Sequence, residues 1–139
     1  MSTPGCDLIA GLIAALRADP MLSALCDDRI HDALPDRAVF PNVSITRHTL
    51  IPVRAEGAGT EHQIAWLVSS RFSGGEEALA IAEAMRVALT TAPSPEGLHM
   101  TGLSVTRAEV FPAPDRRFWH GLIQMRVMVE TLNDNPLTP

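Results

Sequence analysis

Apolar and polar positions alternate along residues 116–132, near the end of the chain. The odd positions of this stretch form an almost wholly apolar row: Trp119, Gly121, Ile123, Met125, Val127 and Val129. The even positions place His120, Gln124 and Arg126 among large apolar side chains. Because successive strand side chains point to opposite faces, the pattern predicts a long strand with one core face and one mixed face. The mixed face fits a protein contact, although exposed apolar residues are also common on strands that contact nothing.

Apolar residues at helical spacing predict three helices elsewhere. The first is capped by Thr3 and has Pro4 at its first helical position, and Asp19 with Pro20 begins a second, shorter one in the same way. A third helix follows Ser73, whose hydroxyl and a Glu three residues later match a capping box. The apolar stripe of the first helix is Leu8, Ile9, Leu12, Ile13 and Leu16, and that of the third is Ala78, Ile81, Ala82, Met85 and Leu89.

Three further stretches, 38–51, 62–72 and 100–111, alternate as strands do. With the last strand they make two sequential hairpins, so we expect a mainly antiparallel four-stranded sheet. Helices on one face would complete an α+β two-layer sandwich in the order α-α-β-β-α-β-β. We expect one domain over residues 1–132 and a flexible tail over 133–139, which holds two prolines.

Composition narrows the classes of function. The formal net charge is −5, every basic residue is Arg, and no basic run exceeds the pair Arg116–Arg117, so nucleic-acid binding is not expected. No apolar run approaches the ~20 residues of a membrane span, and the N-terminus lacks the pattern of a signal peptide. We therefore expect a cytoplasmic protein in which Cys6 and Cys26 are reduced and buried.

The sequence offers no motif for chemistry. The five histidines have neither mutual spacing nor nearby cysteines that suit a metal, and no phosphate loop or nucleophile elbow is present. Asp115, His120 and Glu109 could meet across a hairpin, but three ordinary polar residues near a turn are more often solvated. Trp66 and Trp119 lie on apolar strand faces and are expected in the core. We predict no enzyme, and no catalytic, cofactor-binding or metal-binding residue.

Several stretches together resemble the tail-completion, or tail-terminator, proteins of long-tailed phages and gene transfer agents. The resemblance covers most of the chain, and it depends on the order and spacing of the pieces. It also includes the aromatic–His–Gly pattern at Trp119, His120 and Gly121. The matching stretches are Leu16–Pro35, Phe40–Ile45, Glu61–Arg71, Gly74–Leu89 and Phe118–Glu130.

The resemblance implies a structural subunit that assembles as a ring, usually a hexamer. The ring would cap the tail tube, stop its polymerisation and join it to the head-side connector or stopper protein. Such a protein would work in the cytoplasm of the producing cell and then remain in the particle. A head–tail connector ring of another type and a small-molecule-binding α+β domain are the alternatives. The sequence does not distinguish a phage from a gene transfer agent.

Residues for these contacts follow from the strand pattern and from two connections. The connection Pro52–Glu61 is polar and contains two glycines, so it is either a floppy linker or an arm that orders against a partner. The residues expected at contacts are His120, Gln124 and Arg126 on the mixed strand face, Arg54 and Glu56 in that connection, and Arg116 and Arg117 before the last strand.

Overall fold

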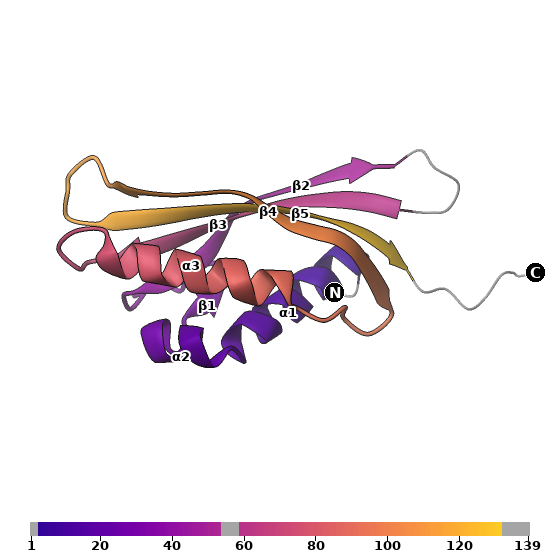
Figure 1. Cartoon of the computed structure of the whole chain (residues 1–139), viewed down its shortest axis with the longest axis horizontal. Coiled ribbons are helices and arrows are strands. Elements are labelled where there is room, and N and C mark those ends of the chain that lie inside the picture. The colour runs from indigo at the N-terminus through magenta and orange to yellow at the C-terminus, as the bar shows by residue number, and fades with distance from the viewer. Residues whose placement is uncertain (1–2, 54–58, 132–139) are drawn as a thin grey trace, which may run out of the picture.

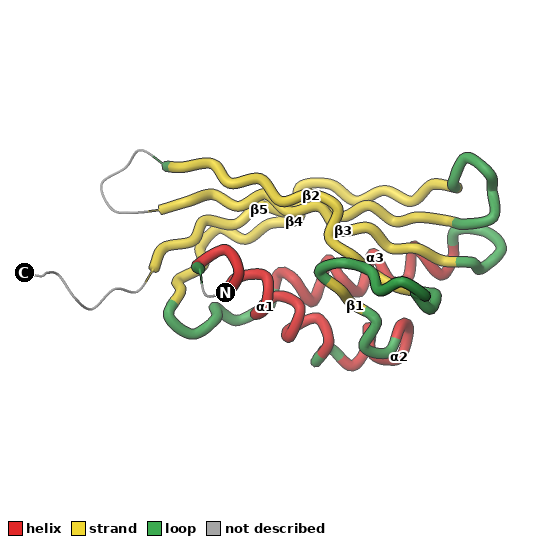
Figure 2. Tube along the Cα trace, turned by 180° about the vertical axis from the view of Figure 1, so that it is seen from behind, coloured by secondary structure: helices red, strands yellow, loops and turns green. Residues whose placement is uncertain are grey.

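The structure, a computed structural model, describes residues 3–53 and 59–131 and has two layers, a sheet and a set of helices (Figure 1). The strands lie in the order β1-β2-β3-β5-β4, with β1 parallel to β2 and all other pairs antiparallel. Within the described ranges, the helices lie on one side of the sheet and none covers the other (Figure 2). The elements are α1 (Pro4–Arg17), α2 (Pro20–Cys26), β1 (Ile30–His31), β2 (Asn42–Pro52), β3 (Gly59–Ser70), α3 (Glu76–Thr90), β4 (Leu98–Pro112) and β5 (Trp119–Thr131).

The expected α+β class is confirmed, but the expected sheet was one strand short. The missing strand is β1, which pairs in parallel with Val43 and Ser44 of β2. The sheet is therefore mixed and five-stranded, and the element order is α-α-β-β-β-α-β-β. With only two residues, β1 is too short to show the alternation that identifies a strand in a sequence.

The first two helices are capped by the residues that were expected to cap them, Thr3 and Asp19. The backbone N–H of Cys6 donates to Thr3 Oγ1 at 3.1 Å, and that of Leu22 donates to Asp19 Oδ2 at 3.0 Å. Each side chain satisfies a backbone donor that would otherwise have no partner in the first helical turn. The acidic residue and the following proline thus set the sharp change of direction between α1 and α2, whose axes are bent by 81°.

The capping box expected at the start of α3 does not form. The N-cap is Gly75, and no side chain caps this helix. The Ser70 hydroxyl donates instead to Glu77 Oε1 at 2.6 Å, across the connection from β3. Ser73 and Glu76 match the capping motif in sequence, but the chain enters the helix one residue before Glu76, so the Ser73 side chain has no place at the cap.

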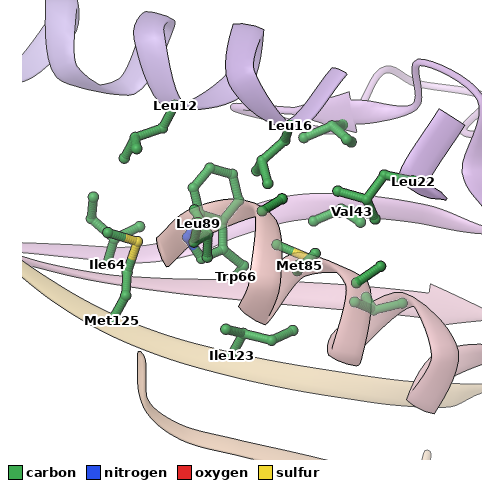
Figure 3. Packing of buried hydrophobic residues seen from close by; sticks show 14 of the residues in the cluster. Leu12, Leu16, Leu22, Val43, Ile64, Trp66, Met85, Leu89, Ile123 and Met125 are labelled. Atoms are coloured by element: carbon green, nitrogen blue, oxygen red, sulfur yellow. The ribbon is translucent and has the colours of Figure 1, made fainter. Parts of the chain in front are cut away.

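The core lies between the helices and the sheet, and the apolar row of β5 contributes Ile123 and Met125 to it (Figure 3). Ile123, Met125 and Val127 are at most 1% exposed and belong to one cluster with the apolar residues of α3. Trp66 is fully buried, whereas Trp119 is only partly buried at the edge of the cluster, which corrects its expected place in the core.

Close packing of α3 on β5 depends on the glycine in this row. A methyl group added at Gly121 would lie 3.3 Å from Val68 Cβ and 3.4 Å from the Ala78 carbonyl oxygen. A side chain at this position would therefore press against both the neighbouring strand and the helix backbone.

Other expectations need smaller corrections or lie outside the described residues. Cys26 is buried, which raises the pKa of its thiol, but Cys6 is exposed. The first long strand begins at Asn42 rather than at residue 38. Arg54, Glu56 and the tail 133–139 lie outside the described residues, so the expectations for them and for the domain boundary stay predictions.

Among the described residues, no single helix is long and apolar enough to cross a bilayer. α1 and α2 pass that test only as a bent pair, by length and composition. Their apolar residues, including Leu12, Leu16 and Leu22, are buried in the core of this structure (Figure 3).

Candidate assembly interface

The mixed face of β5 belongs to the side of the sheet that no described helix covers, here called the outer face. β5 lies between β3 and β4, so the side chains of all three strands share this surface. Gln124 is in register with Ala65 and Arg107, and Arg126 is in register with Gln63. The mixed pattern seen in one strand thus extends across the sheet.

A shallow hollow of about 310 Å³ lies in the middle of the outer face. In register, Ala65 stands between Arg47 of β2 and Gln124 of β5. Its small side chain leaves room between two long polar neighbours. The polar side chains that line the hollow are Arg47, Thr49, Gln63, Thr106, Gln124 and Arg126.

The hollow holds cations without matching carboxylates. Glu109, the nearest acid on β4, is paired with Arg107 at 3.1 Å. Glu61, near the rim, accepts a hydrogen bond from the Gln63 amide at 2.8 Å. Among the described residues, neither Arg47 nor Arg126 forms an ion pair, and both are exposed. The hollow is therefore a local concentration of positive charge on an acidic protein.

His120 shares the outer face but is not part of the hollow. It lies six residues from Arg126, roughly 20 Å along the strand. Its Nδ1 is 3.3 Å from both Ser69 Oγ and the Val68 carbonyl oxygen, and its ring centroid is 5.7 Å from that of Phe111. Its own subunit thus provides polar and aromatic neighbours for this ring.

The two arginines before β5 lie at one end of the molecule, away from the hollow. Arg116 has a φ of 60°, and the backbone N–H of Arg117 donates to Asp115 Oδ1 at 3.0 Å. At this end the guanidinium of Arg71 stacks 4.5 Å above the Phe40 ring and 5.4 Å from the Phe118 ring. The structure therefore brings together Gln124 and Arg126, but neither His120 nor Arg116 and Arg117 joins them.

The polar residues that could have met across the last hairpin each have other neighbours in the structure. Glu109 is paired with Arg107, and His120 contacts Ser69. Across residues 3–53 and 59–131, no three His, Cys, Asp or Glu side chains are placed to hold a metal ion.

Sequence reasoning missed the contribution of Arg47 because of a β-bulge. Ile45 pairs with Trp66 on the core face, so simple alternation would also place Arg47 inward. The register shifts between these two residues, which turns Arg47 to the outer face opposite Ala65. A similar shift between Val105 and Arg107 leaves Thr106 at the hollow. Both bulges follow from the paired backbone and leave no signal in the sequence.

A second unpartnered surface lies on the helical layer. A groove of about 400 Å³ runs between α2 and α3, with Asp19 and Glu83 among its lining residues. Its apolar side chains are unusually open, because Met21 is 62% exposed and Val87 is 54% exposed. Leu79, which lies on α3 like Val87, is 49% exposed. The molecule therefore has two unlike surfaces, one polar and cationic on the sheet and one apolar on the helices.

Comparisons with known proteins agree with this architecture. Residues 10–130 match the model of a family described as "Tail completion protein gp17". A similar solved chain comes from a structure titled "Virion of native gene transfer agent (GTA) particle"; it has 25% identity and a TM-score of 0.83, and the match covers 94% of this chain and 99% of that one. Among curated proteins, none matches significantly. Because the family model spans most of the sequence, the chain belongs to the tail completion protein gp17 family.

Proposed function

We propose that this protein is a tail terminator, a ring subunit that caps the finished tail tube, stops its polymerisation and joins it to the head-side connector. As a member of the tail completion family, it is a structural protein of a phage or gene transfer agent tail. The similarity to a chain of a gene transfer agent virion supports a place in the assembled particle. The proposed role involves no catalysis, and assembly would take place in the cytoplasm of the producing cell.

The observation that carries the proposal is the outer face of the sheet. Its Arg47 and Arg126 lie beside Gln124, form no ion pair with any described residue, and have no described helix over them. We infer that this face contacts a neighbouring subunit or a tail partner, because Arg and amide side chains add directed hydrogen bonds to an apolar contact.

A ring also needs a second, different surface on each subunit. Closed rings larger than dimers form through heterologous contacts, in which one patch meets an unlike patch of the next copy. The groove between α2 and α3, with the exposed side chains of Met21 and Val87, is the candidate for that second patch. A hexamer is the ring order we propose.

Mass photometry of the purified chain tests the ring directly. We expect a population at six times the subunit mass of 15.0 kDa. Electron microscopy of tail tubes assembled with and without the protein then tests capping, and we expect tubes of limited length only when it is present. A chain that stays monomeric and leaves tube length unchanged would exclude the terminator role.

A head–tail connector ring of another type is the alternative function, because it would show the same ring mass. Position in the particle separates the two. A terminator lies against the last ring of the tail tube, so an antibody or gold label on this chain should mark isolated tails that have no head. Label found only on heads without tails would favour the connector.

A further inference from the structure

We propose that the hollow on the outer face is a binding site for carboxylate side chains, and that its occupant is an acidic segment of a partner protein. The inference rests on the proposed role of this face in assembly, and it specifies the chemistry of the contact. The side chains that would bind the segment are Arg47 and Arg126, assisted by Gln63, Gln124, Thr49 and Thr106.

Charge selects an anionic ligand. The acids nearest the hollow are engaged within the subunit, Glu109 by Arg107 and Glu61 by Gln63. Arg47 and Arg126 have no such partner among the described residues. A cation that has lost its water at a contact is costly unless an opposite charge compensates it, so a surface that covers these two arginines must supply negative charge.

The lining also provides the geometry that carboxylates need. A guanidinium presents a planar fork of N–H donors that matches the two oxygens of a carboxylate. Amide and hydroxyl groups of Gln124 and Thr49 can donate to the remaining lone pairs. The small side chain of Ala65 leaves the floor open. At about 310 Å³ the hollow holds roughly ten water molecules, which is room for one or two acidic side chains.

A protein segment fits this surface better than nucleic acid does. A phosphate backbone requires a continuous track of cations, whereas here the cationic hollow is short, and Glu61 and Glu130 follow on the neighbouring stretches of β3 and β5. Those acids would repel a polyanion of uniform charge. A short acidic segment can place its carboxylates in the hollow and direct its other residues away from them.

Side-chain amide signals in nuclear magnetic resonance provide the test. The isotope-labelled subunit is titrated with an oligoglutamate peptide, with an oligolysine peptide and with a short DNA duplex. We expect the amide signals of Gln63 and Gln124 to shift with oligoglutamate and to remain unchanged with oligolysine. No shift with oligoglutamate, or a stronger response to the duplex, would overturn the proposal.

Variants then test whether oligoglutamate binding depends on the two arginines of the hollow. Arg47→Gln and Arg126→Gln should each weaken oligoglutamate binding about tenfold, because each removes one charge-assisted contact worth about 1.4 kcal/mol. Arg107→Gln is the matched control on the same face, since it removes the same charge at a residue that does not line the hollow, and it should leave affinity within about twofold. Equal losses in all three variants would indicate nonspecific attraction and overturn the site. A subunit that binds the peptide but forms no ring would disprove the proposed function and leave the site intact.

Discussion

At the scale of single residues, the least expected feature is a pair of histidines beneath the sheet. His48 Nε2 lies 2.8 Å from His62 Nδ1, and His62 is only 2% exposed. Burial is the main cause that lowers the pKa of both imidazoles. The charge of His48 lowers the pKa of His62 further, while Asp32 partly opposes the shift of His48. One ring must donate to the other, so the bond joins β2 to β3 only while at least one imidazole is neutral.

This pair predicts loss of stability in acid. In the unfolded chain each imidazole titrates near its usual pKa of 6.5, but the folded values lie below it. The unfolded state therefore binds more protons as pH falls through about 6.5, and the free energy of unfolding decreases. Denaturant unfolding of the wild type and of His62→Gln at pH 7.5 and pH 5 checks this.

The change in the free energy of unfolding between pH 7.5 and pH 5, compared among variants, separates the effect of the histidine pair from that of other titrating groups. His62→Gln should lose less stability than the wild type between the two pH values, whatever its absolute stability. His99→Gln is the control, because His99 is exposed on β4, and its slope should equal that of the wild type. Parallel slopes for all three proteins would show that the buried pair does not contribute to acid sensitivity.

The core row of β5 gives a second prediction for a single residue. Ile123 is completely buried in the cluster with α3, so Ile123→Ala should lower the free energy of unfolding by about 2–5 kcal/mol. Thermal and denaturant unfolding measure the change. Glu130→Ala, at an exposed position of the same strand, should change it by less than about 0.5 kcal/mol. An Ile123→Ala protein as stable as the Glu130→Ala protein would show that the two faces of β5 had been exchanged.

At the scale of elements, the sequence predicts what is long and regular and misses what is short or irregular. β5 has thirteen residues of clear alternation, and the row from Ile123 to Val129 lies on the core face as predicted. β1 has two residues, and the bulges in β2 and β4 depend on how strands pair across the sheet. Two of the six polar side chains that line the hollow were therefore predictable, namely Gln124 and Arg126. The other four, including Arg47, could be placed only once the strand register was known.

Among the elements, α3 is the one expected to contact another copy, through its exposed side in the groove with α2. Val87 is 54% exposed in the groove with α2, so Val87→Asp should leave the subunit folded. It would place a charge in an apolar contact without a partner, which costs the ring stability. Mass photometry should therefore show subunits in place of rings. Ala14→Asp adds the same charge at an exposed position of α1 and should assemble normally. If Val87→Asp also forms rings, the second contact does not involve this groove.

At the scale of the whole molecule, two layers with different exposed chemistry suit repeated assembly. The outer face of the sheet presents a cationic hollow, near which Arg107 pairs with Glu109 and Gln63 with Glu61, and the helices present an apolar groove. Figure 1 shows the strands extending past the ends of the helices, so part of the outer face is supported only by the sheet itself. The core interactions do not involve the outer residues, so outer-face variants can test assembly without testing folding.

Replacement of Arg126 by Glu tests, in complete particles, whether the outer face serves assembly and not folding. The side chain is exposed and opposite to the core row, so the free subunit should unfold at the wild-type temperature. At the contact, the substitution replaces a cation by an anion, which should weaken binding to an acidic partner by about 2–5 kcal/mol. Electron microscopy of particles should then show tails of uncontrolled length or tails not joined to heads.

Arg107→Glu is the stringent control for this experiment, because it makes the same charge change on the same face. Arg107 does not line the hollow, so its reversal, although it also frees Glu109, should disturb partner contacts less than Arg126→Glu does. Normal tails in Arg107→Glu particles and defective tails in Arg126→Glu particles would locate the contact at the hollow. Normal tails in both would mean that the outer face points to solvent or to the lumen of a ring, and that subunits and partners meet through the helical layer.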